Sequence, residues 1–336
     1  VDSVACQTVD ATPRRERTTC SAFFQRNSHF RTNYRMVASS ENEAIAVIKD
    51  LAAGTVGGCG GIIAGQPLDT VKVRIQSPTT RGLYRGPIHC FLKIVTDEGP
   101  LALFKGMTSP LVGNAPMQAI VFGMNGNANR IMDKYIPSLR QKERDLPGSK
   151  PNFLRLYLAG TWAGIGQLSV CVPVELIKCK LQVQQDQKVK TFKGPWDCVR
   201  QIYQKSGVLG LYRGFWATFW RDAPSYGLYF VLYEMSKWRL SDKEGKNTML
   251  SLLFSGGVAG IGTWLFTYPF DIVKSIIQTL PIDCPRHERT LVYQFTTNYR
   301  LNGYRFFTRG LSACIARAIP ANAATFLLYE LTLKFI

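Results

Sequence analysis

Three short segments place an acidic and a basic side chain three residues apart, each time just after a proline. The segments are PLDTVKVRIQ from Pro67, PVELIKCKLQ from Pro173 and PFDIVKSIIQ from Pro269. Residues three apart lie on one face of a helix, so each segment presents a carboxylate beside an ammonium group. These groups can pair between helices, and the predicted pairs are Asp69 with Lys178, Glu175 with Lys274, and Asp271 with Lys72.

A glutamine lies nine residues after each of these prolines and is predicted to brace the ion pairs. The three glutamines are Gln76, Gln182 and Gln278. Charges close to a membrane interior are costly unless they are paired. Each pair also loses solvation, so its net strength is modest. We interpret the three pairs as a gate that can open; the alternative is a static, structural ring of ions.

A second set of charges lies inside stretches that are otherwise apolar. Arg221, Asp222 and Arg317 precede two aligned prolines by two or three residues, and Asn114 lies at the same level of the first copy. Two arginines and one aspartate that face a cavity suit a zwitterion, because a guanidinium binds a carboxylate and an aspartate binds an amine. These four residues are the predicted substrate site; the alternative is a structural pair of Arg221 and Asp222 with nothing bound.

Six long stretches are expected to position these charges. Residues 51–68, 106–129, 156–174 and 247–270 contain no Asp, Glu, Lys or Arg, whereas residues 214–233 and 310–329 carry the buried charges just described. About 18 or more apolar residues suffice to cross the hydrocarbon core of a bilayer. The sequence therefore predicts an all-α membrane protein with six transmembrane helices.

The helices are arranged in three tandem copies of one unit. Glycines recur at fixed distances before each proline, and the segments EGPLALFKG, SGVLGLYRG and NGYRFFTRG align downstream of it. Each unit has two spans, so the chain returns to its starting side and three equivalent units can surround one axis. The predicted units are residues 46–150, 151–246 and 247–336, with short amphipathic helices between the spans. Residues 1–45 are a basic extension, read either as a transit-like segment or as a disordered tail.

The composition excludes several other classes of protein. The net charge of +18 is spread through the connecting segments, and no basic helix is interleaved with aromatics, which argues against a nucleic-acid partner and favours anionic lipid. The nine cysteines form no CxxC pair, and the three histidines cluster with no other ligand. We therefore predict no metal, no cofactor and no enzymatic activity.

The motif P-x-D/E-x-x-K/R, found three times over residues 46–336, resembles that of the mitochondrial carrier family. This resemblance implies a pseudo-threefold transporter of the inner mitochondrial membrane, a monomer bound by anionic lipid such as cardiolipin, with both termini towards the intermembrane space. It also implies alternating access between a matrix gate, formed by the three ion pairs, and a cytoplasmic gate. The cytoplasmic gate residues are Tyr233, Glu234, Lys237, Tyr329 and Glu330.

Some positions depart from the family pattern. Ser206 and Asn302 replace an expected acid, and the first unit has Asn125 and Gly126 where the cytoplasmic gate has charges. That gate is therefore expected to be the weaker one.

The Arg-Asp pair of the fourth helix and the segment RAIPANAATF resemble the branch that carries carnitine, acylcarnitines and basic amino acids. Basic amino-acid carriers usually have an acid where this chain has Met117, so the prediction is a carrier of carnitine or acylcarnitine. The alternatives are a carrier of basic or methylated amino acids or choline-like amines, and, from another class, a scaffold or receptor that does not transport.

Overall fold

The computed structural model describes residues 40–80, 82–139, 151–184, 191–241, 248–308 and 310–335. Within these residues all regular structure is helical, as predicted. The predicted extension, residues 1–45, lies almost wholly outside the described residues.

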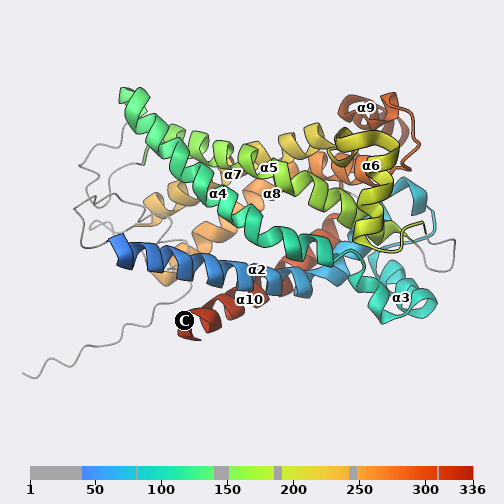
Figure 1. Ribbon diagram of the computed structural model, residues 1–336, viewed down its shortest axis with the longest axis horizontal. Helices are drawn as coiled ribbons and strands as arrows, with labels where there is room; N and C mark the ends of the chain where they lie inside the picture. Colours follow the sequence, from blue (N-terminus) through green and yellow to red (C-terminus); the bar gives the residue numbers. More distant parts are fainter. Residues whose placement is uncertain are drawn as a thin grey trace, which may run out of the picture.

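Six long helices form the body of the molecule and run along its longest axis (Figure 1). They are α2 (Ser40–Gln76), α4 (Thr108–Tyr135), α5 (Phe153–Val183), α7 (Phe215–Leu240), α8 (Met249–Thr279) and α10 (Leu311–Phe335). Each contains an internal proline and continues past it. None of the described helices combines sufficient length with a sufficiently apolar stretch to be identified as a membrane span.

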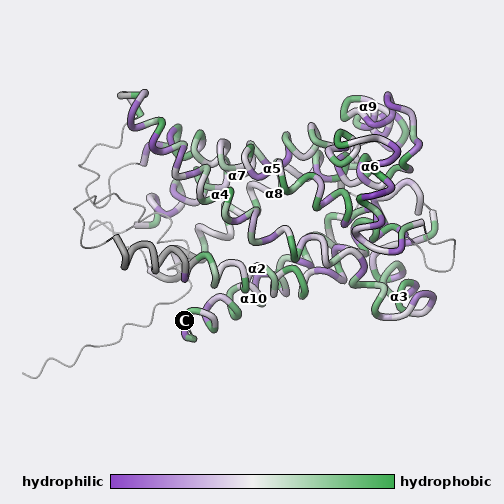
Figure 2. Tube along the Cα trace, in the orientation of Figure 1, coloured by the Kyte–Doolittle hydropathy of each residue, from purple (hydrophilic) through white to green (hydrophobic). Residues whose placement is uncertain are grey.

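Three short helices connect the long ones at one end of the bundle, opposite the end of α10 (Figure 1). They are α3 (Pro87–Glu98), α6 (Pro195–Leu211) and α9 (Leu291–Asn302). The first two begin with a proline, whose fixed φ suits the first helical position. In α9 the side chain of Thr290 accepts a hydrogen bond from the amide of Tyr293 instead. Figure 2 shows hydrophobic and hydrophilic residues mixed along these short helices.

The three units interlock in a cycle. Each proline helix that carries an acid–lysine pair packs along a helix of the preceding unit: α5 along α4, α8 along α7, and α2 along α10, which closes the ring. The helices α2, α5 and α8 also contact one another. This arrangement brings the three acid–lysine segments together.

Close helix contacts depend on glycine, as two examples show. A Cβ atom at Gly57 of α2 would lie 2.7 Å from the carbonyl oxygen of Thr325 in α10. A Cβ atom at Gly160 of α5 would lie 2.8 Å from the carbonyl oxygen of Tyr226 in α7. Small residues let helix backbones approach in this way, so these glycines have a packing role.

Candidate functional site

The three predicted ion pairs form between α2, α5 and α8. Lys178 Nζ lies 2.5 Å from Asp69 Oδ2, Lys274 Nζ lies 2.7 Å from Glu175 Oε2, and Lys72 Nζ lies 2.5 Å from Asp271 Oδ2. Each pair joins two different units, in the cyclic order predicted from the sequence. Together they close the bundle at the end that carries the short helices, which we call the gate layer.

The predicted brace residues also connect neighbouring units. Gln182 of α5 donates to the hydroxyl of Thr70 in α2, over 3.2 Å, and Gln76 of α2 donates to the hydroxyl of Tyr268 in α8, over 3.5 Å. Gln278 of α8 accepts a hydrogen bond from the thiol of Cys179 in α5. The glutamines therefore join the same helices as the ion pairs, about one helical turn closer to the C-terminal ends of these helices.

A cavity of about 330 Å³ lies next to the gate layer, between α4, α5 and α7. The charged side chains in its lining are Glu175, Lys178, Arg221 and Asp222. The guanidinium of Arg221 is the centre of this group, because its nitrogens lie 2.5 Å from Asp222 Oδ1, 2.9 Å from Glu175 Oε1 and 3.4 Å from Asp271 Oδ1. One cation thus contacts three carboxylates, two of which belong to the gate layer.

Two other predicted binding residues have different surroundings. Arg317 of α10 lies with its Nε 3.1 Å from Asp69 Oδ1, so it contacts the gate layer, and it does not contribute to the lining of the 330 Å³ cavity. Asn114 lines the cavity, and its amide also donates to the backbone oxygen of Thr55 in α2, over 2.9 Å. The structure therefore brings Arg221, Asp222 and Asn114 to one cavity and directs Arg317 to a gate carboxylate.

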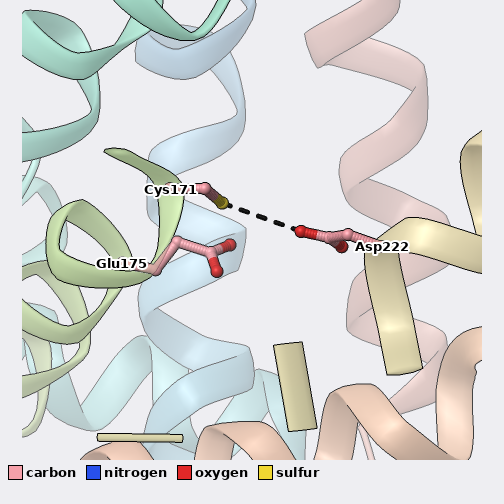
Figure 3. Close-up of side chains that lie close together, drawn as sticks. All are labelled: Cys171, Glu175 and Asp222. Carbon is pink, nitrogen blue, oxygen red and sulfur yellow. Dashed lines mark hydrogen bonds between the residues drawn. The ribbon is translucent and has the colours of Figure 1, made fainter. Parts of the chain in front are cut away.

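Three potential metal ligands also meet in this cavity. Figure 3 shows Cys171 and Glu175 of α5 facing Asp222 of α7, and their ligand atoms lie within 4.8 Å of one another. The thiol of Cys171 donates to Asp222 over 3.7 Å. Both carboxylates already contact Arg221, and Glu175 also contacts Lys274. The two carboxylates of this cluster are therefore already paired with cationic side chains.

The sequence comparisons fit this architecture. The family described as "Mitochondrial carrier protein" matches three successive segments, residues 43–135, 149–244 and 245–336. This chain belongs to the mitochondrial carrier family. Members of the family are transporters, so the absence of enzymatic activity predicted from the sequence agrees with the family assignment.

Individual relatives cover most of the carrier. The "Mitochondrial basic amino acids transporter" of Bos taurus is 40% identical over 288 residues, which is 85% of this chain and 91% of the relative. The human "Solute carrier family 25 member 45" is 35% identical, over 86% of this chain and 99% of the relative. The "Mitochondrial carnitine/acylcarnitine carrier protein" of Mus musculus is 34% identical, over 89% and 97% respectively.

At the other end of the carrier, the predicted cytoplasmic gate residues occupy α7 and α10. Lys237 Nζ lies 3.2 Å from Glu234 Oε1 and over the ring of Tyr233, and all three residues belong to α7. Tyr233 and Tyr329 are buried, and Glu330 is half-buried. Their role as a gate stays a prediction.

A clamp that sequence reasoning missed joins α4 to α5 at this same end. Arg155 makes a two-pronged contact with Asp133, with nitrogen–oxygen distances of 2.5 and 3.0 Å. It also donates to the side chain of Asn129 and to the backbone oxygen of Leu139. The clamp joins the second unit to the first, and the first unit lacks the charges of the cytoplasmic gate motif. The one signal in the sequence was an arginine at the very start of an uncharged stretch.

Outside the gate layer, the first unit has a buried acid that the second unit lacks. Glu98 accepts from Arg74 Nη2 over 2.9 Å and from Lys105 Nζ over 2.6 Å. Burial alone would raise the pKa of Glu98, but the hydrogen bonds from Arg74 and Lys105 lower it below its usual value. The carboxylate is therefore charged and ties α2 to the short helix α3 and to the segment after it.

Proposed function

We propose that this carrier moves a basic amino acid, such as lysine, arginine or ornithine, across the inner mitochondrial membrane by alternating access. The observation that carries the proposal is the contact of one guanidinium with two cavity carboxylates. Arg221 lies 2.5 Å from Asp222 and 2.9 Å from Glu175. A substrate with a cationic side chain can replace this guanidinium and use the same two acids, since charge-assisted hydrogen bonds to carboxylates are strong.

The carnitine prediction rested on the lack of a second acid at Met117. Glu175 supplies that acid from a neighbouring helix, because it faces the cavity as well as the gate layer. The relatives support the same choice: the protein named as a basic amino acids transporter is 40% identical, whereas the carnitine/acylcarnitine carrier is 34% identical. We therefore favour the amino-acid alternative over carnitine.

The geometry suggests how binding is coupled to opening. The carboxylate of Glu175 contacts Lys274 through one oxygen and Arg221 through the other. When a substrate cation binds to Glu175 and Asp222, Arg221 is released and can bind the substrate carboxylate. The cation then competes with Lys274 for Glu175, which weakens one pair of the gate layer.

The remaining expectations from the family resemblance belong to this proposal. Six helices of 25 to 37 residues exceed the roughly 20 residues that span a bilayer. We take them as the transmembrane helices of a monomer, with both termini towards the intermembrane space and anionic lipid around the basic connecting segments. The predicted exchange of substrates (antiport) is part of the same proposal.

Uptake into liposomes containing the purified carrier tests the proposal. We expect transport of arginine, lysine and ornithine, and the variant Asp222→Asn should lower it about 30-fold or more, because a buried charge loses its partner. The matched control is Asp283→Asn, which changes an exposed aspartate paired with Lys205 far from the cavity. Transport of carnitine or acylcarnitine without arginine would contradict the proposal, and no transport at all would favour a scaffold.

A further inference from the structure

A small cavity lies between the end of α5, the helix α6 and the turn that follows α8. It has a volume of about 10 Å³. Its polar lining consists of Lys180, Arg213, Arg289 and Ser206, and the rest is apolar. Three cations, of which Lys180 is buried and Arg213 and Arg289 are half-buried, therefore surround a space to which no carboxylate contributes. This environment is unusual because like charges repel one another, and more strongly where water is partly excluded.

The first unit shows what normally balances these charges. Lys180 and Arg213 are the counterparts of Arg74 and Lys105 in the repeat alignment, and Ser206 is the counterpart of Glu98. In the first unit Glu98 contacts both cations. The second unit keeps the two cations and has a hydroxyl in place of the acid.

Backbone carbonyls satisfy only part of the hydrogen-bonding capacity of these cations. Lys180 donates to the backbone oxygen of Leu280, Arg213 Nη1 donates to that of Pro281 over 2.7 Å, and Arg289 donates to Cys284 and Ile282. Arg213 Nε and Nη2 are fully buried and reach no oxygen acceptor among the described residues. Two donors of this half-buried arginine thus lack an oxygen acceptor and can bind an anion, and the thiol of Cys284 lies next to the guanidinium.

The other charged groups near this small cavity do not balance its positive charge. Asp283 is exposed and pairs with Lys205, and Glu288 accepts a hydrogen bond from the thiol of Cys284. Burial raises the pKa of the Cys284 and Cys198 thiols, so both are neutral. Lys180 is buried, and the other charged residues in the lining are Arg213 and Arg289.

We propose that this cavity binds a single small inorganic anion, such as chloride, between Lys180, Arg213, Arg289 and Ser206. The volume of about 10 Å³ admits one water-sized group, since roughly 10–15 Å³ is needed for a water molecule, and it is too small for a phosphate group. The ion stands in for the carboxylate that the first unit supplies. It links the second unit to the segment that follows α8 in the third, independently of the transported substrate.

Thermal unfolding of the purified carrier in detergent tests the site, with sodium chloride compared against sodium gluconate at equal ionic strength. We expect chloride to raise the melting temperature by about 2–4 °C at saturating concentrations. Coincident unfolding curves in the two salts would overturn the proposal. A melting temperature that rises with phosphate or cardiolipin but not with chloride would also overturn the proposal.

Two variants locate the effect. Ser206→Glu supplies the missing carboxylate and should abolish the difference between chloride and gluconate, whereas Thr296→Glu adds the same charge to an exposed position of α9 and should keep it. If Ser206→Glu keeps the full difference in melting temperature between chloride and gluconate, then this cavity does not bind the anion. Line broadening of the ³⁵Cl resonance by the unaltered protein gives a second readout, which Lys180→Gln should reduce; broadening unchanged by that substitution would also contradict the site.

Discussion

At the scale of single residues, the two oxygens of the Glu175 carboxylate have different partners. One contacts the gate lysine Lys274, and the other contacts Arg221 in the cavity. Asp69 is the corresponding acid of the first unit, but its partners are Lys178 and Arg317, and it does not line the cavity. If the proposed roles hold, Glu175 takes part in both the gate and the binding site, whereas Asp69 takes part in the gate alone.

This difference predicts unequal effects of two matched substitutions. Glu175→Gln and Asp69→Asn each remove one carboxylate charge from the gate layer. Only Glu175→Gln also removes a cavity acid, so we expect its KM for arginine to rise about tenfold or more, while Asp69→Asn changes KM by less than about threefold. Initial rates of arginine uptake into liposomes measure both values. Equal changes in KM would mean that Glu175 does not touch the substrate.

The sequence predicted the gate pairs but not the second partners of their acids. The pairs follow from spacing alone: three residues between acid and lysine, repeated three times, fix which faces of α2, α5 and α8 meet. The contacts of Glu175 with Arg221 and of Asp69 with Arg317 depend on how far an arginine side chain reaches from a neighbouring helix. No periodicity records that reach, so an argument from Met117 alone does not find the second acid of the cavity, Glu175.

At the scale of secondary-structure elements, the units are joined differently at the two ends of the bundle. The gate layer joins α2, α5 and α8 symmetrically. At the opposite end, the contacts of Arg155 with Asp133 and Asn129 join α4 to α5. The fold class and the order of helices could be predicted from the repeats. The clamp could not, since it occurs once, between the first and second units, and has no repeated motif.

Weakening the clamp should lower the stability of the protein without affecting the binding of substrate. Arg155→Lys keeps the charge but cannot make the two-pronged contact with Asp133. We expect the free energy of unfolding to fall by about 1–2 kcal/mol and the melting temperature to fall by a few degrees. Arg130→Gln alters an exposed residue of α4 and serves as the control. Thermal unfolding in detergent compares the two; an unchanged melting temperature in Arg155→Lys would show that the clamp is energetically neutral.

At the scale of the whole molecule, the three gate pairs close one ring but differ in burial. The side chains of Lys72 and Asp271, which join the third unit to the first, are 9% and 5% exposed, whereas those of Lys178 and Asp69 are 17% and 19% exposed. Lys72 Nζ also lies 5.4 Å from the ring centre of Trp264. Breaking a buried pair by removing one partner is costly, because an uncompensated charge remains.

The pair of Lys72 and Asp271, which closes the ring, should therefore be the pair whose loss destabilises the protein most. We expect Lys72→Gln to lower the melting temperature more than Lys178→Gln does, since it leaves the more deeply buried carboxylate without its lysine. Replacing both partners, as in Lys72→Gln with Asp271→Asn, should restore part of that loss, because no lone charge stays buried. Thermal unfolding of the single and double variants measures both effects. A double variant that is less stable than both single variants would mean that the pair acts through shape and hydrogen bonding rather than through its opposite charges.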